Sequence, residues 1–356
     1  MALYRLNRII QRYDHRTVLS IDGLELAQGS ITGLVGANGS GKTTLLKLLG
    51  FVERPAQGEI LFDERPVPPL DPAARRSIAL LPQESHLLKR TVYANVAYGL
   101  RVRNDRKEER QRVAQSLAWV GLPPENFARR PWFALSGGEA RRAALAARLV
   151  LRPRVLLLDE PTTSVDGASA QLMKAAALHA HRQWGTSLVV ASHDLPWLHE
   201  ICTDVVHLFA GRILGRGQQT LLFGPWRQLS PGKVAMALGE TQRFIALRPE
   251  KEKTALTAAI DPARLTLLQP GEAPPEGREV MEGIVTRLAL DRPTGGIHVV
   301  VAVGPTEFSV PLPAGHPALA ALSPGRPARI AYGPGEVRWY DQNLLNQASS
   351  CESPGR

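Results

Sequence analysis

Residues 36–44 read Gly-Ala-Asn-Gly-Ser-Gly-Lys-Thr-Thr, and this glycine-rich segment constrains the fold more than any other part of the chain. The apolar run at 31–35 predicts a buried strand before it, and a helix is expected to begin near Lys42. Glycines let consecutive backbone N–H groups turn around a phosphate, which the positive end of the helix also faces. The sequence therefore predicts an α/β fold with a P-loop that binds a nucleoside triphosphate.

The residues of this loop have distinct expected roles. We expect Lys42 to contact the β- and γ-phosphates and the Thr43 hydroxyl to ligate Mg²⁺, a cation that prefers oxygen ligands. The residues expected to surround the bound nucleotide here are Gly36, Asn38, Gly39, Ser40, Gly41, Lys42, Thr43 and Thr44.

A second apolar run, at 155–158, ends in Asp159 and Glu160. This pattern is typical of a central parallel strand that delivers carboxylates to one edge of a sheet, where chemistry sits in such folds. We expect Asp159 to hold Mg²⁺ and Glu160 to accept the proton of the water that attacks the γ-phosphate. The alternative is that the two carboxylates only cap a helix.

Length and composition narrow the class of protein. The chain has 356 residues, of which 44% are hydrophobic, so two domains are expected, or three. No stretch approaches the ~20 apolar residues of a membrane helix, and Met1 to Arg16 lacks a secretory segment, so a cytosolic protein is predicted. Cys202 and Cys351 lie far apart in the sequence and predict neither a disulfide framework nor a metal cluster.

The formal net charge of +10 is compatible with nucleic acid, an anionic membrane surface or a basic phosphate-binding enzyme as partner or function. The arginines and lysines occur in short scattered groups, without the interleaved aromatic residues that stack on bases. This distribution favours the last two classes and predicts no nucleic-acid partner.

A third motif, Leu135-Ser136-Gly137-Gly138-Glu139, precedes an Ala- and Arg-rich helical stretch at 140–151. Alone it is an ordinary helix entry, in which a serine N-cap is followed by a glutamate. About 100 residues after a phosphate loop, however, it resembles the signature of the ATP-binding cassette ATPases. The resemblance covers residues 3 to about 240.

This resemblance implies ATP and Mg²⁺ as cofactors and a homodimer that traps two ATP molecules at its interface. In such a dimer, four signature residues of one chain close on the nucleotide held by the other chain: Ser136, Gly137, Gly138 and Glu139. The resemblance also implies partners, namely integral-membrane permease subunits and, through them, an extracytoplasmic substrate-binding protein. The protein would then work peripherally, at the cytoplasmic face of the membrane.

Four further positions match elements of the same family. Tyr13 stands where the family places an aromatic ring against adenine, and Gln83 matches the glutamine that senses Mg²⁺ and the attacking water. His193 matches the histidine that contacts the γ-phosphate, although a lone histidine after a strand is more often structural. Asp166, in Ser164-Val165-Asp166, belongs to the loop between the two sites, which differs at one hydrophobic position from the family's Ser-Ala-Leu-Asp. The resemblance implies that Glu160, His193 and Gln83 act in catalysis and that Thr43, Gln83 and Asp159 hold the metal.

The composition changes near residue 240, so we expect a nucleotide-binding domain at 1–240, a small β-barrel at 241–342 and a disordered tail at 343–356. A short helical segment is expected at 223–232. The strands expected in the barrel are 283–285, 297–303, 308–312, 329–332 and 337–339. The barrel resembles the domains appended to import ATPases, including those related to molybdate- and tungstate-binding proteins.

Oxyanion-binding barrels of that kind carry a Ser-Ala-Arg-Asn stretch where this chain has Glu276-Gly277-Arg278-Glu279. Arg278 is retained, but a carboxylate that faces an oxyanion opposes binding. Both a regulatory oxyanion site and a purely structural barrel remain open.

The cargo is not encoded in these motifs, because a permease and a binding protein select it. The segments at 9–19 and 48–51 look most like those of tungstate-importer ATPases, with molybdate, another oxyanion or an unrelated cargo as alternatives. A different class is a cassette ATPase without a permease that acts on nucleic acid or ribosomes. That class usually has two fused cassettes or a long coiled coil, whereas this chain has one phosphate loop and no sustained heptads. An oxyanion-sensing regulator would need a DNA-binding module, for which no pattern is found.

Overall fold

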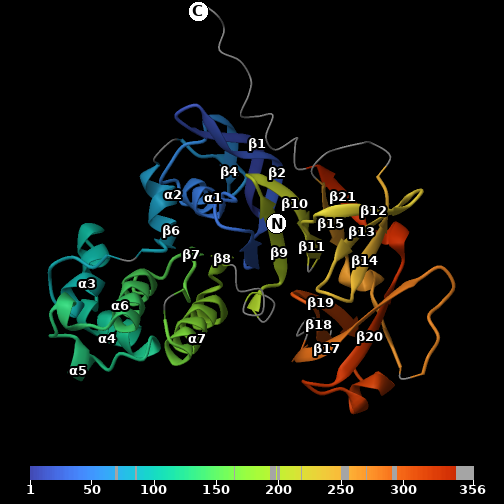
Figure 1. Ribbon diagram of the computed structural model, residues 1–356. Coiled ribbons are helices and arrows are strands. Elements are labelled where there is room, and N and C mark those ends of the chain that lie inside the picture. Colours follow the sequence, from blue (N-terminus) through green and yellow to red (C-terminus); the bar gives the residue numbers. More distant parts are fainter. Residues whose placement is uncertain are drawn as a thin grey trace, which may run out of the picture. The chain divides into compact units, whose positions relative to one another are not determined.

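The computed structural model describes residues 1–341 apart from positions 69–70, 85, 164, 193–197, 199–200, 218, 250–255, 270 and 291–294. The chain divides into two compact units, Met1–Ile213 and Leu214–Arg356. Sheets and helices alternate in the first unit, whereas the described part of the second consists mainly of strands (Figure 1). The tail predicted to be disordered lies outside the described residues.

A parallel sheet forms the centre of the first unit. The strand order is β10-β9-β3-β8-β7-β6, with parallel pairing from β9 through to β6. Its strands are β3 (Ile31–Val35), β6 (Ile78–Leu81), β7 (Val155–Asp159), β8 (Ser187–Ala191), β9 (Asp204–Phe209) and β10 (Arg212–Arg216). All residues of β3, β7 and β8 are buried, as expected for strands covered on both faces. The carboxyl ends of β3 and β7 therefore meet at one edge of the sheet, where ligands bind in such folds.

An antiparallel sheet packs on one side of the first helix. It has the order β2-β1-β4-β5 and consists of β1 (Ala2–Tyr13), β2 (Arg16–Ala27), β4 (Gln57–Phe62) and β5 (Arg65–Pro66). Helix α1 (Lys42–Leu49) lies between this sheet and the parallel one. Its Leu45 and Leu49 belong to the same buried cluster as Leu6 of β1 and Leu157 of β7. This burial fixes the start of α1, and with it the phosphate loop, against both sheets.

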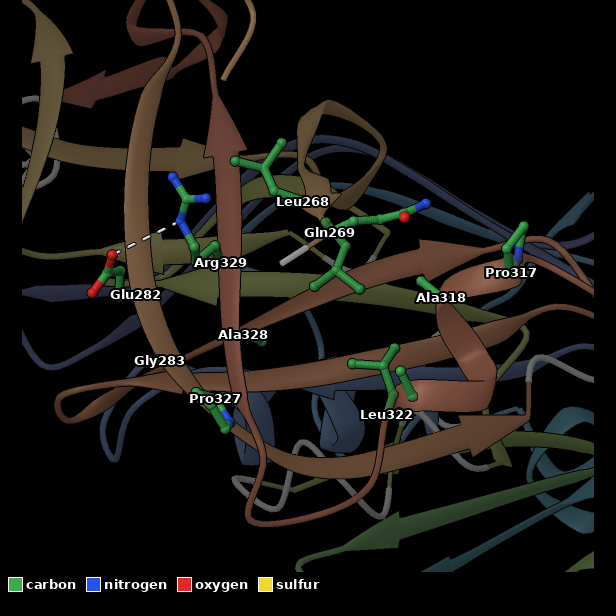
Figure 2. Close-up of a pocket in the computed structure, with 12 residues that line it drawn as sticks. Leu268, Gln269, Glu282, Gly283, Pro317, Ala318, Leu322, Pro327, Ala328 and Arg329 are labelled. Atoms are coloured by element: carbon green, nitrogen blue, oxygen red, sulfur yellow. Dashed lines mark ion pairs between the residues drawn. The ribbon is translucent and has the colours of Figure 1, made fainter. Parts of the chain in front are cut away.

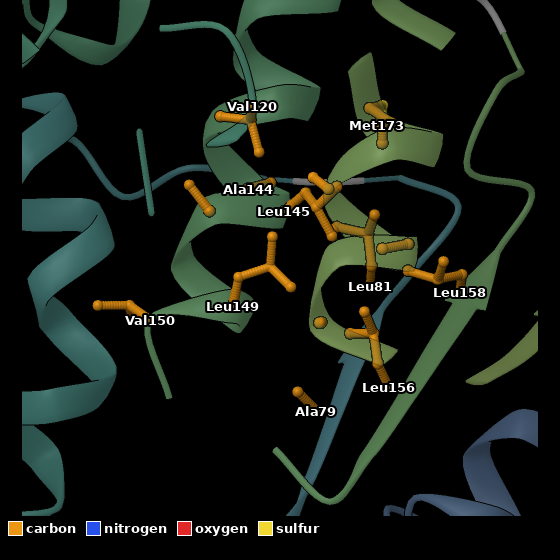
Figure 3. Close-up of a cluster of buried hydrophobic side chains, with 14 of the residues drawn as sticks. Ala79, Leu81, Val120, Ala144, Leu145, Leu149, Val150, Leu156, Leu158 and Met173 are labelled. Carbon is orange, nitrogen blue, oxygen red and sulfur yellow. The ribbon is translucent and has the colours of Figure 1, made fainter. Parts of the chain in front are cut away.

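Helix α2 (Pro72–Ser77) lies next to β6 on the α1 side of the parallel sheet. The other helices of the first unit belong to the layer on the opposite face, and they are α3 (Val92–Val102), α4 (Glu109–Trp119), α5 (Pro124–Phe127), α6 (Gly137–Leu149) and α7 (Gly167–Trp184). In Figure 3, Leu145 and Leu149 of α6 pack toward Leu156 and Leu158 of β7. Among the residues that the structure describes, every helix is too short or too polar to span a bilayer.

The second unit is a small β domain with one hydrophobic core. A five-stranded sheet of order β16-β20-β17-β18-β19 forms an open half-barrel, and two three-stranded sheets, β11-β15-β21 and β12-β13-β14, pack on the same core. The strands are β11 (Thr220–Leu222), β12 (Trp226–Ser230), β13 (Lys233–Ala237), β14 (Arg243–Leu247), β15 (Leu256–Ile260), β16 (Thr266–Leu268), β17 (Glu279–Leu290), β18 (Ile297–Val303), β19 (Thr306–Leu312), β20 (Pro327–Tyr332) and β21 (Arg338–Asp341). Phe244 stacks on Tyr332, with ring centroids 4.5 Å apart, and joins two of these sheets.

The structure agrees with the predicted fold class and differs from the prediction in one detail. The α/β cassette and the five strands predicted near the C-terminus are confirmed. The two compact units meet between residues 213 and 214, and the domain bounds 1–240 and 241–342 stay a prediction. The segment predicted as helical, 223–232, forms β12 and its flanking turns. Leu222, Met236 and Phe244 point into the core of the second unit, and this burial draws the segment into strands.

Candidate active site

The phosphate loop connects β3 to α1 and is shaped by two close approaches of its backbone. A Cβ atom at Gly36 would collide with the carbonyl oxygen of Leu208, and one at Gly41 would collide with the side chain of Leu19. Gly41, the N-cap of α1, also has a φ of 100°, a value that L side chains rarely adopt. Only glycine fits these two positions. The close backbone packing of the loop therefore requires the same glycines that form the phosphate-binding motif.

Lys42 is buried at the first position of α1. Its Nζ donates to the carbonyl oxygens of Gly36 (2.6 Å) and Ala37 (3.3 Å) and lies 3.7 Å from Oε1 of Glu160. The ammonium group is thus held inside the loop, with the carboxylate of Glu160 beside it. Asn38 and Gly39, at the tip of the loop, are exposed, whereas Ser40 and Thr44 are buried.

Asp159 ends β7 and is 2% exposed. Burial raises the pKa of its carboxyl group above the ordinary value, and a hydrogen bond from Thr43 acts in the opposite direction. Within the described residues, Oδ1 of Asp159 is buried without a hydrogen-bond partner. A carboxylate oxygen of this kind next to a hydroxyl is the donor set that Mg²⁺ prefers, so the residues present fit this ion.

Glu160 follows the strand and is also buried. Its backbone has a φ of 45°, an uncommon conformation for a residue other than glycine, and its N–H donates to the carbonyl oxygen of Ala191 (2.8 Å). Oε2 accepts a hydrogen bond from Thr163 (3.1 Å). The carboxylate is therefore held at the edge of the sheet, beside Lys42 and hydrogen-bonded to Thr163.

Tyr13 ends β1 and lies next to the first turn of α1. Its hydroxyl donates to Glu53, which also accepts a hydrogen bond from Lys47 (3.0 Å) and a longer one from Gln11 (3.4 Å). Burial and the hydrogen bond to Glu53 raise the pKa of Tyr13, while a side-chain hydrogen bond with Thr44 lowers it. The ring remains 38% exposed, so it is anchored at its hydroxyl and accessible beside the loop.

The signature motif forms the start of α6. Ser136 is the N-cap: its Oγ accepts from the N–H of Glu139 (3.3 Å), and its own N–H donates to the Glu139 carboxylate (2.8 Å), which completes a capping box. Ser136 and Gly137 are exposed. A Cβ atom at Gly138 would lie 3.3 Å from Oδ2 of Asp166, so the signature meets the N-cap of α7.

The structure thus brings some of the predicted site residues together and leaves others apart. Lys42, Thr43, Asp159 and Glu160 meet at one edge of the sheet. Within the described residues, no hydrogen bond or ion pair joins the signature motif to the phosphate loop of the same chain. The side chain of Gln83, which follows β6, is exposed. The prediction for His193 falls outside the described residues.

Arg141 is a site residue that the sequence analysis missed. It lies on α6 with its side chain buried, and it donates hydrogen bonds to the carbonyl oxygens of Gln83, Asp159, Glu160 and Pro161. A signal was present in the sequence, since the buried residues of α6 include Arg141, Leu145 and Leu149, spaced four apart. An arginine on the apolar stripe of a helix must satisfy its donors inside the protein.

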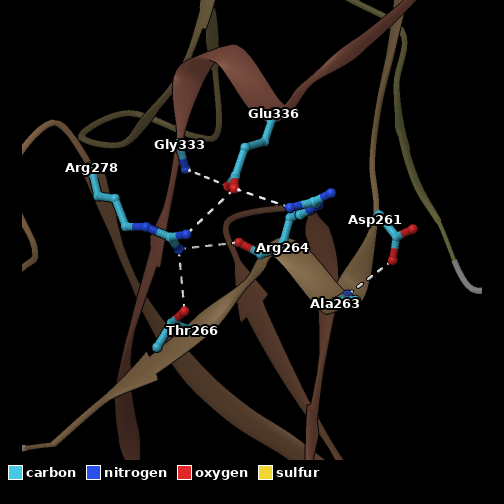
Figure 4. Close-up of polar contacts among 7 residues, drawn as sticks. All are labelled: Asp261, Ala263, Arg264, Thr266, Arg278, Gly333 and Glu336. Atoms are coloured by element: carbon cyan, nitrogen blue, oxygen red, sulfur yellow. Dashed lines mark hydrogen bonds and ion pairs between the residues drawn. The ribbon is translucent and has the colours of Figure 1, made fainter.

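The second unit uses Arg278 as a structural residue. In Figure 4, its guanidinium approaches Glu336 (3.4 Å from Nη2 to Oε1), and Nη1 donates to the carbonyl oxygen of Arg264 and the hydroxyl of Thr266. Glu336 also accepts from the N–H of Gly333 (3.0 Å). Arg278 therefore ties the start of β17 to β16 and to the turn at Pro334–Glu336 after β20, an arrangement that supports the structural alternative over the oxyanion site.

A cavity of about 360 Å³ lies between β16, β17, β20 and the turn at 317–322 (Figure 2). Its walls are mainly apolar and include Leu268, Leu322 and Ala328, with an ion pair between Glu282 and Arg329 (3.8 Å) at one side. An oxyanion needs several converging hydrogen-bond donors, which this lining does not supply. The cavity therefore adds no support for an oxyanion site in this unit.

Comparison with known proteins agrees with the nucleotide-binding geometry described above. The profile of the ABC transporter family matches residues 19–163. The tungstate uptake system ATP-binding protein TupC of Peptoclostridium acidaminophilum is 32% identical over 209 residues, which are 58% of this chain and 95% of TupC. The methionine import ATP-binding protein MetN of Thermobifida fusca is 36% identical over 211 residues, which are 57% of this chain and 65% of MetN.

Solved structures include a similar cassette. The dimeric structure of MJ0796, a bacterial ABC transporter cassette, aligns with a TM-score of 0.56 at 25% identity and covers 60% of this chain and 98% of that one. The phosphate loop, the two buried carboxylates and the signature helix are thus found in a chain that matches this family in both sequence and fold. The protein belongs to the ATP-binding subunits of the ABC transporter family, and it is an ATPase.

Proposed function

We propose that this chain is the ATP-hydrolysing subunit of an ABC importer for tungstate, which it powers through a separate permease and an extracytoplasmic binding protein. The observation that carries the hydrolytic part is the buried group of Lys42, Asp159 and Glu160. The similarity to TupC, which extends over nearly the whole length of that protein, supports tungstate. In this proposal the chain lies peripherally at the cytoplasmic face of the membrane.

The proposed chemistry gives each site residue a role. Lys42 binds the phosphates, and Thr43 and Asp159 would hold Mg²⁺, with Gln83 as a further ligand. When bound, Mg²⁺ neutralises charge that develops on the phosphate oxygens. Glu160 accepts the proton of the attacking water, and His193 contacts the γ-phosphate. The ring of Tyr13 stacks on adenine.

A second copy of the chain completes the site in this proposal. Ser136 and Gly137 are exposed at the positive end of α6, which is suited to an anion. Within the described residues, no hydrogen bond or ion pair joins the signature motif to its own phosphate loop, whereas the motif of a second copy can reach the nucleotide from outside. The dimeric cassette MJ0796 is a precedent for such pairing. ATP binding then closes the dimer and hydrolysis releases it.

The surface near Gln83 supplies the expected contact to the permease. Gln83 is exposed at the point where the parallel sheet joins the helical layer, and its carbonyl oxygen is held by Arg141. A movement of this loop on hydrolysis would therefore reach a partner bound to the helices. Membrane permease subunits are the partners that we propose here, and we propose no role for nucleic acid.

Methionine is a second candidate cargo, because MetN is 36% identical over a similar length of this chain. This chain spans only 65% of MetN, however, so the similarity does not extend to the whole of that protein. Molybdate is a third candidate, since it is a tetrahedral oxyanion like tungstate.

ATPase activity in the assembled transporter separates these candidates. The chain is co-purified with its permease in lipid, and hydrolysis is measured while tungstate, molybdate, sulfate or methionine is titrated with and without the binding protein. Stimulation by tungstate that requires the binding protein is the expected result. Stimulation by methionine alone would assign the other cargo, and co-purification with RNA and ribosomes in place of a permease would contradict the importer.

A further inference from the structure

The guanidinium of Arg141 lies where three functional segments of the cassette meet. Arg141 is 8% exposed and sits in the second turn of α6, the helix that begins with the signature motif. Nε donates to the carbonyl oxygen of Pro161 (3.0 Å), and Nη2 donates to those of Asp159 (3.1 Å) and Glu160 (2.5 Å). Nη1 donates to the carbonyl oxygen of Gln83.

All four acceptors are backbone oxygens, so the hydrogen bonds of Arg141 hold the main chain and not side chains. An arginine fork is planar and rigid, so it fixes its acceptors relative to one another. Here it joins the end of β7 to the loop after β6 and ties both to α6. Because the fork uses carbonyl oxygens, these four hydrogen bonds do not involve the carboxylates of Asp159 and Glu160.

Glu160 depends on such support, because its backbone adopts a φ of 45°. A conformation of this kind persists only when surrounding contacts hold it. Three hydrogen bonds do so at its main chain: the N–H donates to the carbonyl oxygen of Ala191 (2.8 Å), and the Glu160 carbonyl oxygen accepts from Arg141 (2.5 Å) and from the N–H of Thr163 (3.2 Å). Loss of the hydrogen bond from Arg141 would allow the residue to relax and the carboxylate to move.

We propose that Arg141 is a positioning residue that couples movement of the signature helix to Glu160 and Gln83 of the same subunit, and thereby links the two nucleotide sites of a dimer. This inference rests on the proposed dimer, in which Ser136 faces the nucleotide of the second copy. When Ser136 contacts the nucleotide of the second copy, α6 moves. The hydrogen bonds of Arg141 then transmit this movement to Glu160 of the same subunit.

Burial lowers the pKa of Arg141, while the charges of Asp159 and Glu160 act in the opposite direction. The guanidinium is thus desolvated and depends on its four acceptors. A purely structural arginine would meet this description as well, so the test must separate positioning from folding. Catalysis and cooperativity respond to positioning, whereas nucleotide affinity and the unfolding temperature report on the fold.

The test uses the full chain with Arg141→Gln and Arg141→Lys, and Arg142→Gln as the matched control. Arg142 lies on the same helix and donates to the carbonyl oxygens of Val120 (2.9 Å) and Gly121 (2.8 Å), away from the site. For each variant, kcat, KM and the Hill coefficient for Mg-ATP are measured, together with the dissociation constant of Mg-ADP and the unfolding temperature.

A displaced catalytic group costs about 10²-fold in rate, so kcat of Arg141→Gln is expected to fall by roughly 10- to 100-fold. The Hill coefficient is expected to fall toward one, with Mg-ADP affinity within about two-fold of wild type, since the phosphate loop is untouched. Arg141→Lys keeps the charge but loses the fork and should follow the glutamine variant. Arg142→Gln should lower the unfolding temperature and leave the Hill coefficient unchanged.

Three results would overturn the inference: wild-type kcat and cooperativity in the Arg141 variants, unfolding of both variants, or a loss of kcat that an equal loss of Mg-ADP affinity accompanies. Failure of the proposed dimer is visible separately, because the wild-type chain would then hydrolyse ATP with a Hill coefficient of one.

Discussion

Nζ of Lys42 and Oε1 of Glu160 lie 3.7 Å apart, and both side chains are at most 7% exposed. One residue belongs to the phosphate loop and the other follows β7, so the pair joins two segments that are more than 100 residues apart in sequence. The cation proposed to bind phosphate and the carboxylate proposed to activate water are therefore adjacent in a buried site, where electrostatic interactions are stronger than in water.

Replacing Glu160 by glutamine is expected to abolish turnover and retain binding. The variant keeps the shape of the side chain and loses the proton acceptor, and loss of a general base costs about 10²- to 10⁴-fold in rate. The measurements are kcat and the Mg-ADP dissociation constant. Glu59→Gln, an exposed position on β4, is the control and should hydrolyse ATP like wild type. A Glu160→Gln variant with more than a tenth of wild-type kcat would assign the base elsewhere.

Asp159→Asn is expected to weaken metal binding and to raise the stability of the metal-free protein. Burial raises the pKa of Asp159, so its ionised form is less favourable in the folded state than in the unfolded one. Removal of this charge should raise the unfolding temperature in EDTA by about 2–4 °C, the shift that ~1 kcal/mol gives in a unit of this size. Addition of Mg-ADP should stabilise wild type more than the variant. A variant that is less stable than wild type in EDTA contradicts this account of Asp159.

Tyr13 is expected to contribute through its ring and not through its hydroxyl. Base–aromatic stacking is worth about 1–3 kcal/mol, so Tyr13→Ala should raise KM for ATP by roughly 5- to 100-fold. Tyr13→Phe keeps the ring and loses the hydroxyl with its hydrogen bonds to Glu53 and Thr44, so its KM should stay within about three-fold. Steady-state kinetics with ATP tests both variants. Equal effects of the two substitutions would mean that the hydroxyl network, and not stacking, matters.

Glu53 predicts a pH dependence of stability. Burial acts to raise the pKa of Glu53, but hydrogen bonds from Tyr13 and Lys47 outweigh it and hold the pKa below the ordinary value of 4.5. A carboxyl group with a lowered folded-state pKa stabilises the protein above its unfolded-state pKa, and this contribution disappears as pH falls through the folded-state value. Since the pair with Lys47 is partly exposed and screened by solvent, its contribution is about 0.5–1 kcal/mol.

The check is the difference in unfolding temperature between wild type and Glu53→Gln across pH. A difference of about 1–3 °C is expected at pH 7, given the size of the first unit, and it should shrink below pH 4.5 and vanish at lower pH. A difference that stays constant from pH 7 to pH 3 would show that the ionised carboxylate does not contribute.

The sequence was sufficient for the parts of the site that local chemistry defines. The phosphate loop, the acids after β7 and the capping box at Ser136 each depend on residues within about ten positions, and the structure forms all three as predicted. The alternative that Asp159 and Glu160 only cap a helix is excluded, because β7 and its pairing with β8 place them at the edge of the sheet.

Contacts between distant segments could not be predicted in the same way. Tyr13 and Glu53 are 40 positions apart, and Arg141 and Gln83 are 58 apart, so neither contact has a local sequence signal. The helix predicted at 223–232 was wrong for a related reason. The segment at 223–232 has turn residues that suggested a short helix, but pairing of β12 with β13 and the core around Phe244 decide its structure. Tertiary burial overrides local propensity in such segments.

The central claim, ATP-driven closure of a homodimer around sites completed by Ser136, is tested most directly by the molar mass of Glu160→Gln in solution. Size-exclusion chromatography with light scattering is run in Mg-ATP and in Mg-ADP. The account predicts twice the mass of the chain in Mg-ATP and a single chain in Mg-ADP, because only the γ-phosphate reaches the signature motif of the second copy. A single chain at saturating Mg-ATP would contradict it.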